Sequence, residues 1–354
     1  MRIVQLNPYH YPYMGGIEHR IHEVSKRLSS KHEMIVLTGR LPGTKAEEET
    51  DGYRVIRLPS RLVDIYNPPF ISTPGVLKAL NELEPDVVDF HYRWAPSYTK
   101  AMNRYRGKWT FTFHNTYGEG HGLNRAVSLI NDAMFCRRIR EQRVICITEF
   151  IKGDLVKRGF SPDMLEVIPP GIDLEERHGP EGDYILFIGR LVGTKGIPYL
   201  IRAMAKVDGK LIIVGDGPEK RRLEAAARSA GVAEKVMFTG RVTEEEKAGL
   251  LSNCRVFAMP SLFESYGLAV AEAMSWGKPV VASRVGGLPE VVGDGGILCR
   301  PRDPLAIAAA LNYMLEDDRA RQEYACRARK HIQRFSWTNV VRDIEATYRK
   351  VAGE

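Results

Sequence analysis

The amino-acid sequence predicts an α/β protein with two doubly wound, mainly parallel sheets in separate domains. A short apolar segment, a glycine-containing loop and an amphipathic helix open the chain, which is the layout of a nucleotide-binding α/β unit. The same order of segments begins again at Tyr184. Between the halves lies the polar stretch Leu174 to Asp183, which contains glycine and proline and is the best linker candidate. A length of 354 residues suits two such domains.

The first half begins with a strand predicted at Ile3 to Leu6 and a loop from Asn7 to Gly16. Gly15 and Gly16 in this loop allow a phosphate group to approach the backbone closely, although a plain turn explains the pair equally well. The loop lacks a G-x-G-x-x-G fingerprint, so a dehydrogenase has no support. Apolar residues at helical spacing then predict a helix with one buried face: Ile17, Ile21, Val24 and Leu28.

The first half then alternates strands and helices, with a polar turn from Leu41 to Gly52. Strands are predicted at Met34 to Thr38, Tyr53 to Leu58, Asp86 to Phe90, Trp109 to Phe113, Arg143 to Thr148 and Leu165 to Ile168. Helices are predicted at Thr73 to Leu83, His121 to Gln142 and Glu149 to Arg158. His91 and His114 each follow a strand, where functional residues of doubly wound folds gather. A lone histidine is more often structural or exposed. His91 is interpreted only as a residue that lines a ligand site.

The second half repeats the alternation. Strands are predicted at Tyr184 to Ile188, Lys210 to Val214, Lys235 to Thr239, Val256 to Pro260 and Val280 to Ser283. Helices are predicted from Ile197 onward and at Glu219 to Ala230, Leu268 to Trp276, Asp303 to Leu315, Arg319 to Arg334 and Trp337 to Lys350. Arg190 and Lys195 lie in the loop before the first of these helices, and together they suit a diphosphate. Either cation alone would be an ordinary surface residue.

Two carboxylates belong to the stretch Val256 to Ser283. Glu264 lies in a loop and Glu272 on the following helix, with seven residues between them. Backbone N–H groups at a helix start attract anions, and carboxylates accept hydrogen bonds from hydroxyls, so the stretch suits a phosphorylated, polyhydroxylated ligand. Two glutamates at this spacing would normally be solvated, but alanines flank Glu272 on both sides.

The composition is that of an ordinary globular protein with a net charge of +7 and a pI of about 9.1. This charge permits anionic ligands, an anionic membrane surface or nucleic acid without establishing any of them. The basic residues of the first half are interpreted as a solvated surface rather than a patch for anionic lipid or a phosphorylated acceptor. No apolar run approaches the roughly 20 residues of a membrane helix. Five scattered cysteines lack metal-ligand spacing and are expected to be reduced in a cytoplasmic protein.

The segment PSLFESYGLAVAEAMSWGKPVVAS resembles the E-x7-E signature of the retaining glycosyltransferases of family 4. This family has the GT-B fold of two Rossmann-like domains that face a cleft. Residues 189–196 resemble its GR-L-x-x-x-KG signature, and residues 169–173 resemble its PNGVD segment with Pro170 in place of asparagine. The resemblance covers most of the chain and is strongest from Tyr184 to Leu298.

The resemblance implies a role for each candidate residue. Glu264 would meet the hydroxyls of the donor sugar, and Glu272 those of the ribose. Arg190 and Lys195 would hold the diphosphate. The other implied donor-site residues are Tyr266, Gly267 and Leu268 at the helix start, Gly15 and Gly16 facing the phosphates, Arg241 and Val242 bordering the base, and His114 near the sugar and the reacting centre.

The implied organisation is an acceptor-side domain at 1–173, a donor-binding domain at 174–336, and a terminal helix at 337–354 that returns to the first domain. The implied reaction moves a hexose from a UDP- or GDP-sugar to a hydroxyl of a sugar, glycolipid or other acceptor, with retention at the anomeric carbon. No D-x-D motif is present, so no metal and no cofactor are expected. We expect a cytoplasmic enzyme that does not bind nucleic acid, with peripheral contact to the inner membrane face left open.

Two alternatives remain at this point. A sugar-nucleotide epimerase shares the GT-B fold, but epimerases have a different set of motifs and lack this E-x7-E signature. A non-catalytic subunit that binds nucleotide sugars would keep the fold and lose Glu264, Arg190 or Lys195, which are all present. The acceptor is not encoded in any motif of the first-half loops, such as Asn7 to Gly16 and Ile65 to Thr73.

Overall fold

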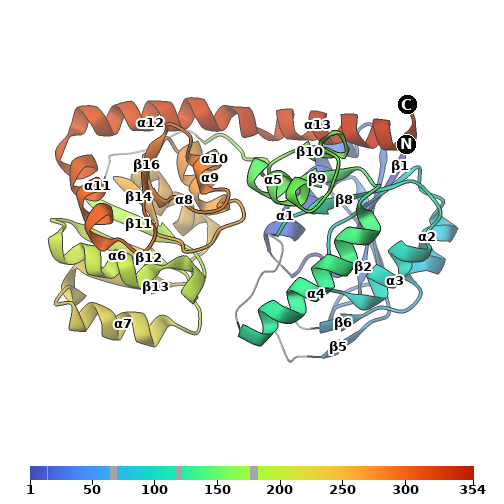
Figure 1. Cartoon of the computed structure of the whole chain (residues 1–354), viewed down its shortest axis with the longest axis horizontal. Helices are drawn as coiled ribbons and strands as arrows, with labels where there is room; N and C mark the ends of the chain where they lie inside the picture. The colour runs from blue at the N-terminus through green and yellow to red at the C-terminus, as the bar shows by residue number, and fades with distance from the viewer. Residues whose placement is uncertain (14, 64–69, 116–121, 176–181) are drawn as a thin grey trace. The chain divides into compact units, whose positions relative to one another are not determined.

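The computed structural model describes the chain except residues 14, 64–69, 116–121 and 176–181, and the side chains of residues 63 and 122–127 (Figure 1). Residues 176–181 of the linker candidate and part of the loop at 65–73 therefore lie outside the described residues. Contacts divide the chain into two compact units, each described below by itself. The first comprises Met1–Gly171 and Thr338–Glu354, and the second Ile172–Trp337.

The first unit contains an eight-stranded sheet among its described residues, in the order β10-β9-β8-β7-β1-β2-β4-β3. All neighbouring strands are parallel except β3 and β4. The strands are β1 (Arg2–Leu6), β2 (Glu33–Gly39), β3 (Glu47–Thr50), β4 (Tyr53–Leu58), β7 (Val87–Phe90), β8 (Trp109–Phe113), β9 (Val144–Cys146) and β10 (Leu165–Val167). A separate antiparallel hairpin consists of β5 (Arg61–Val63) and β6 (Phe70–Ser72).

Helices lie around this sheet (Figure 1). They are α1 (Gly16–Leu28), α2 (Val76–Leu83), α3 (Pro96–Arg104), α4 (Gly122–Ile139), α5 (Glu149–Lys157) and α13 (Trp337–Ala352), with a 3-10 turn η1 (Pro162–Met164). Thr148 caps α5 as predicted, because its Oγ1 accepts from the Ile151 N–H at 3.3 Å. Helix α2 begins three residues later than predicted, after Gly75, which adopts a left-handed conformation with φ +83°.

The prediction of a polar turn from Leu41 to Gly52 was wrong, because this segment contains β3. The acidic sequence looks like a polar loop, but it forms an edge strand that pairs with β4. Glu47 of this strand forms a 2.7 Å ion pair with Arg54 of β4. Edge strands are often charged, since one side of the ladder faces solvent. Helix α3 was not predicted either.

The second unit contains a six-stranded parallel sheet among its described residues, in the order β13-β12-β11-β14-β15-β16. The strands are β11 (Tyr184–Ile188), β12 (Lys210–Val214), β13 (Val236–Gly240), β14 (Val256–Met259), β15 (Val280–Ser283) and β16 (Gly296–Cys299). The helices are α6 (Ile197–Ala203), α7 (Lys220–Ser229), α8 (Glu244–Asn253), α9 (Leu268–Ser275), α10 (Leu288–Val292), α11 (Pro304–Glu316) and α12 (Asp318–Ile332). Four 3-10 turns are η2 (Gly193–Lys195), η3 (Met204–Lys206), η4 (Ala233–Lys235) and η5 (Gln333–Phe335). The sequence analysis did not predict β16, α8 or α10.

The central strands of both sheets are buried on both faces. Ile3 and Val4 of β1 and Ile185, Leu186 and Phe187 of β11 have no exposed surface. This explains why the strands read as continuous apolar runs rather than as alternating patterns. Burial of these runs supplies the main driving force for each unit.

The terminal helix α13 returns to the first unit, as the resemblance implies. Val340, Ile344 and Tyr348 are each 1% exposed, so the predicted apolar face is buried. Polar contacts fix the same helix, because Thr347 Oγ1 donates to Glu166 Oε2 at 2.5 Å. The last residues of the chain therefore complete a unit that begins with the first ones.

Each sheet has one point where the strand order reverses. In the first unit it lies between β1 and β7, and in the second between β11 and β14. In open α/β sheets, ligands bind beyond the carboxyl ends of the strands at such switch points. The loops that follow these four strands are therefore the first places to look for a site.

Candidate active site

The switch point of the second unit joins two loops that the sequence analysis singled out separately. One follows β11 and carries Arg190 and Lys195, and the other follows β14 and carries Glu264. The backbone carbonyl of Thr194 accepts from the N–H of Leu262 at 2.7 Å, which holds the two loops together.

Two glycines permit close approaches to the loop after β14: Gly196 of the loop after β11, and Gly286 of the loop after β15. Gly196 has φ +63°, and a Cβ built on it would lie 2.1 Å from the Pro260 carbonyl oxygen. Gly286 has φ +54°, and its Cβ would lie 1.9 Å from the Glu264 carbonyl oxygen. Both contacts are with backbone atoms, so no side chain fits at either glycine.

Lys195 and Glu264 form an ion pair in this arrangement. Lys195 Nζ lies 2.5 Å from Glu264 Oε2, and the two side chains are 18% and 15% exposed. Ser261 Oγ donates to the same oxygen at 3.4 Å. The sequence analysis assigned this lysine and this glutamate to different parts of a ligand, whereas the structure also pairs them with each other.

Glu272 on α9 has a lysine partner of its own. Lys247 Nζ on α8 lies 3.4 Å from Glu272 Oε1 and 2.6 Å from Glu244 Oε2. Burial raises the pKa of Glu272, and Lys247 opposes this shift. The pKa of Lys247 is also raised, because Glu272 and Glu244 outweigh the opposing effect of burial.

The two carboxylates thus share one pattern. Each commits one oxygen to a lysine, Oε2 in Glu264 and Oε1 in Glu272. The other oxygen of each has no hydrogen-bond partner within the described part of the chain. Both glutamates are held in place and still have an acceptor atom for a hydroxyl group.

The start of α9 is open to an anion. Its N-cap residue Gly267, with φ +105°, offers no capping side chain, so the first N–H groups of the helix lack internal partners. Leu268 begins the helix. Tyr266 is only 4% exposed, and its ring packs edge-on against Phe335 with centroids 6.4 Å apart. The Tyr266 side chain therefore supports the loop from inside.

Arg190 is exposed and has no ion-pair partner among the described residues. Its loop is fixed by the neighbouring turn, because Leu191 N–H donates to the Asp216 carbonyl at 2.9 Å. Arg241 and Val242 lie between β13 and α8, beside a hollow of about 450 Å³. Thr243 and Glu246 form a capping box there that fixes the start of α8.

At the switch point of the first unit, Gly15 and Gly16 differ in their surroundings. A Cβ on Gly15 would lie 2.5 Å from Glu18 Oε2, whereas a Cβ on Gly16 would meet nothing within 4 Å. Glu18 is 5% exposed, and its Oε1 accepts from Asn7 Nδ2 at 3.1 Å. Burial raises the pKa of Glu18 to about 7. This buried carboxyl group was not predicted from the sequence.

His91 and His114 meet at the carboxyl ends of β7 and β8. His91 Nδ1 lies 2.9 Å from His114 Nε2, and His91 Nε2 lies 2.6 Å from Gln5 Oε1. Burial lowers the pKa of both histidines well below the usual range, so both rings are neutral. An amide oxygen can only accept, so His91 donates from Nε2 and accepts at Nδ1. His114 then donates from Nε2, which leaves its Nδ1 as a hydrogen-bond acceptor.

A second set of hydrogen bonds fixes the orientation of Gln5. Gln5 Nε2 donates to Tyr348 Oη at 2.8 Å, and Tyr348 donates to Asp89 Oδ2 at 2.7 Å. Thr112 Oγ1 lies 2.9 Å from both Asp89 oxygens. Burial raises the pKa of Asp89 to about 7, although these hydrogen bonds oppose the shift. The histidine pair is thus oriented by residues of four separate elements.

Comparisons with known proteins identify the family. Residues 14–176 match the family described as Glycosyltransferase Family 4, and residues 173–331 match Glycosyl transferases group 1. The D-inositol 3-phosphate glycosyltransferase of Mycobacterium ulcerans is 31% identical over 316 residues, covering 79% of this chain and 68% of that protein. The chain belongs to the family 4 glycosyltransferases.

Other similarities extend over the whole glycosyltransferase. The phosphatidyl-myo-inositol mannosyltransferase of Mycolicibacterium smegmatis is 29% identical over 382 aligned residues, covering 100% of this chain and 95% of that protein. Some matches are shorter, and one relative with 38% identity is matched over 45% of its own length. The crystal structure of Anabaena Alr3699/HepE in complex with UDP has a TM-score of 0.81 at 22% identity, covering 98% of this chain and 99% of that chain. The glycosyltransferase therefore has the GT-B fold.

The sequence signals for the missed residues were weak. Lys247 ends a run of charged residues at the start of α8, which is typical of a solvated helix face. Gln5, Asp89 and Tyr348 lie within apolar segments that predict buried elements. Only the three-dimensional pairing of β1, β7 and α13 shows that these polar groups satisfy one another.

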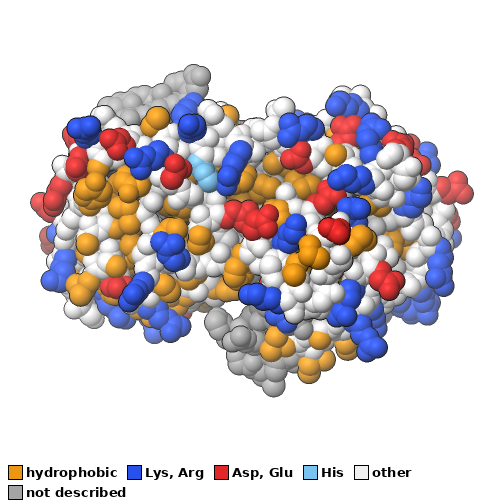
Figure 2. All heavy atoms as spheres, turned by 45° about the horizontal axis from the view of Figure 1, so that its top comes forward, with side chains coloured by type: hydrophobic (Ala, Val, Ile, Leu, Met, Phe, Trp, Pro, Cys, Tyr) orange, Lys and Arg blue, Asp and Glu red, His pale blue; other side chains and the backbone are white. Residues whose placement is uncertain are grey.

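The charge of the glycosyltransferase is distributed rather than concentrated on the face drawn in Figure 2. Lys and Arg side chains there are interspersed with acidic and uncharged groups. None of the helices in the described ranges is long and apolar enough to cross a membrane.

Proposed function

We propose that this glycosyltransferase moves a hexose from a UDP- or GDP-sugar to an acceptor hydroxyl, with retention at the anomeric carbon. The observation that carries the proposal is the second switch point, where Lys195 meets Glu264 beside Arg190 and the uncapped start of α9. Cations and helix amides suit a diphosphate, and the free oxygens of Glu264 and Glu272 suit sugar and ribose hydroxyls.

The chemical step breaks the bond between the anomeric carbon and the diphosphate oxygen and forms a bond to the acceptor oxygen. The sugar passes through an oxocarbenium-like transition state, as in glycoside hydrolysis. Negative charge grows on the departing diphosphate, and Arg190, Lys195 and the α9 amides stabilise it. The acceptor attacks from the leaving-group face, and its proton goes to the departing phosphate oxygen. We assign no side-chain nucleophile.

The same cations make a divalent metal unnecessary in this proposal. Activity is expected to be unchanged in excess EDTA, measured as product formation against an untreated sample. Loss of activity that magnesium restores would contradict this part of the proposal.

The acceptor proposed first is a phosphorylated polyol, free or lipid-linked. Its support is that two relatives are named for inositol 3-phosphate and phosphatidyl-myo-inositol. The Anabaena protein crystallised with UDP-glucose makes a UDP-hexose the first donor to test.

A thermal-shift screen tests donor binding. UDP, GDP, ADP and their hexose conjugates would be added at 100 times the dissociation constant, where a native-state ligand stabilises by about 2.7 kcal/mol. A shift with UDP or GDP supports the proposal, and no shift with any nucleotide contradicts it. The anomeric configuration of the product, read by NMR, then tests retention. Release of an altered sugar nucleotide without acceptor would indicate an epimerase instead.

A further inference from the structure

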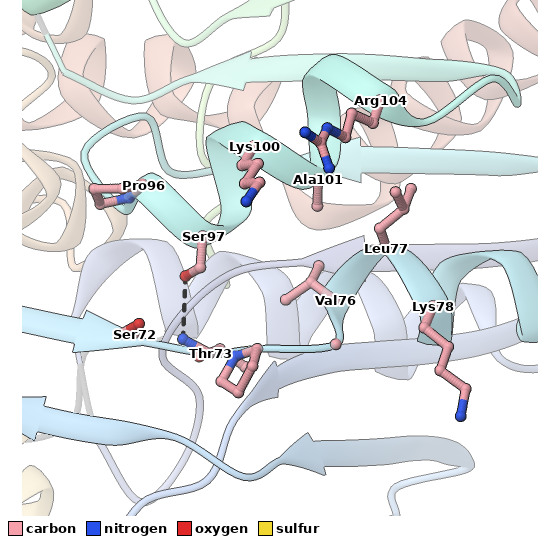
Figure 3. Close-up of a pocket in the computed structure, with 12 residues that line it drawn as sticks. Ser72, Thr73, Val76, Leu77, Lys78, Pro96, Ser97, Lys100, Ala101 and Arg104 are labelled. Carbon is pink, nitrogen blue, oxygen red and sulfur yellow. Dashed lines mark hydrogen bonds between the residues drawn. The ribbon is translucent and has the colours of Figure 1, made fainter.

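The first unit has a pocket between the start of α2 and one side of α3, from Pro96 to Arg104 (Figure 3). Its volume is about 450 Å³, which is within the usual range for small-molecule sites. None of the described residues that line it is acidic. They are Ser72, Thr73, Pro74, Gly75, Val76, Leu77, Lys78, Pro96, Ser97, Lys100, Ala101 and Arg104.

Two cations of the pocket lack a counter-charge. Lys100 and Arg104 stand one helical turn apart on α3, and Figure 3 shows both side chains extending into the space between the helices. Neither has an ion-pair partner among the described residues, and like charges at this spacing repel each other. The pocket therefore carries positive charge that a bound anion would neutralise.

Uncharged hydrogen-bond donors face the same space. Ser97 Oγ accepts from the Thr73 N–H at 3.1 Å, so its own hydroxyl proton remains available to a ligand. Helix α2 starts after Gly75, which offers no capping side chain, so its first N–H groups lack internal partners. A phosphate group accepts hydrogen bonds through several oxygens and matches this set of donors.

One end of the pocket, lined by Pro96 and Ser97, lies at the edge of the sheet where the candidate site of the first unit lies. Helix α3 follows β7, so it starts at the carboxyl edge near His91. Helix α2 ends at the opposite edge, because Arg2 at the start of β1 donates to the Leu83 carbonyl at 2.8 Å. Helix α3 therefore begins at the carboxyl edge, where doubly wound folds bind ligands, and Lys100 and Arg104 lie one and two turns further along it.

We propose that this pocket is the subsite for the phosphate group of a phosphorylated acceptor. The inference rests on the proposed function, since the reaction needs such a subsite only if the acceptor is phosphorylated. Lys100 and Arg104 supply the charge, and Ser97 and the start of α2 supply directed hydrogen bonds. A soluble phosphate ester and a lipid headgroup share this chemistry.

Calorimetric titration with myo-inositol 1-phosphate tests the pocket directly, without any donor. Lys100→Ala and Arg104→Ala are each expected to raise Kd about tenfold, as expected for the loss of a charge-assisted hydrogen bond. Lys78→Ala is the matched control. Lys78 also lines the pocket, but its side chain points away from it in Figure 3 and pairs with Glu82 at 3.6 Å. Its Kd is expected to stay within about twofold of the wild-type value.

A second arm distinguishes the sources of the phosphate. Cosedimentation would compare phosphatidylinositol-containing vesicles with phosphatidylcholine vesicles. Binding of the soluble ester that both α3 variants weaken indicates a free acceptor. Binding only to phosphatidylinositol vesicles, weakened by the same variants, indicates a lipid headgroup. Equal binding by all variants, or no binding of either probe, overturns the subsite.

Nucleotide binding by the same variants separates this proposal from the broader one. The thermal shift with UDP or GDP is expected to be unchanged in Lys100→Ala and Arg104→Ala, because neither residue belongs to the donor site. Phosphate binding without any nucleotide shift would contradict the proposed transfer reaction and leave the anion site intact. A thermal shift with UDP or GDP without binding of the phosphate ester would contradict the phosphate subsite and leave the proposed transfer reaction intact.

Discussion

The two switch points of this glycosyltransferase present their polar groups in opposite ways. In the second unit, Lys195 and Glu264 are charged, partly exposed and paired with each other across two loops. In the first unit, His91 and His114 are neutral, buried and joined in hydrogen bonds that end at Asp89 and Tyr348. The second unit thus presents a partly exposed ion pair, and the first presents a buried network of neutral donors and acceptors.

This difference determines which of the two sites can rearrange its polar contacts at low cost when a substrate binds. A partly exposed ion pair costs little to rearrange, because water screens both charges. A buried network is costly to disturb, because every unpaired group loses its solvation as well as its partner. Substitutions should therefore change substrate turnover most at the second site and ligand orientation at the first.

The largest effect is expected from Lys195→Ala. Removal of a charge proposed to stabilise the departing diphosphate should lower kcat by about 10²- to 10³-fold, with little change in melting temperature. Steady-state kinetics and a thermal melt measure the two quantities. Lys210→Ala is the matched control, because Lys210 pairs with Asp183 on an exposed surface of the same unit. A wild-type rate for Lys195→Ala would remove this residue from the diphosphate site.

A smaller effect is expected from His91→Ala, since His91 acts through its neighbour. Loss of the acceptor at His91 Nδ1 frees the His114 ring to turn, and kcat should fall about tenfold. The same substitution should cost nothing further in a His114→Ala background, which a double-mutant cycle measures. Additive losses would show that His91 stabilises the unit without positioning His114.

Glu272→Ala should act on affinity rather than on rate. Loss of the carboxylate removes the acceptor proposed for the ribose hydroxyls, and Kd for the free nucleotide should rise about tenfold. Glu244→Ala is the control, because Glu244 also pairs with Lys247 but lies 80% exposed at the start of α8. Equal affinity for wild type and Glu272→Ala would exclude the ribose assignment.

The smallest expected effect is a pH dependence of the melting temperature that arises from the buried carboxyl group of Asp89. Folding raises the pKa of this carboxyl group from 3.8 to about 7, so the folded state holds a proton that the unfolded state releases. The resulting stability is present below about pH 4 and is lost as the pH rises through 7. The melting temperature of Asp89→Asn minus that of wild type should therefore increase between pH 5 and pH 8.

Asp183→Asn is the control for this measurement, because folding shifts the pKa of Asp183 in the opposite direction. Lys210 lowers the pKa of the exposed Asp183 carboxyl, so its contribution is lost as the pH falls. The corresponding difference in melting temperature should not increase with pH. A flat difference for Asp89→Asn would mean that Asp89 keeps its ordinary pKa in the folded protein.

The sequence singled out most of the residues that meet at the second switch point, because these candidates lie in contiguous segments. Glycine positions, strand ends and the spacing of Glu264 and Glu272 are local features, and the structure places their loops side by side. The partners of the two glutamates were not predictable in the same way. Lys195 was assigned to phosphate and Lys247 to no role, since ion pairs across 69 and 25 residues leave no local pattern.

In the first unit, less of the site could be predicted from local sequence. His114 was singled out from its position after a strand, but its tautomer depends on Gln5 and Tyr348, which are 343 residues apart. The strand β3 was missed because an acidic edge strand looks like a polar loop. Patterns of hydrophobicity therefore predict where elements lie, whereas the direction of each hydrogen bond requires the folded chain.

The return of α13 to the first unit has a consequence for biosynthesis. The ribosome releases β1, β7 and β8 long before it makes Tyr348, so Gln5 and Asp89 emerge without the hydroxyl group that joins them. The second unit lies entirely between these segments in the sequence and can fold while the first is still incomplete. The histidine pair thus reaches its final arrangement only after Tyr348 has been made, and a chain terminated before this residue would lack it.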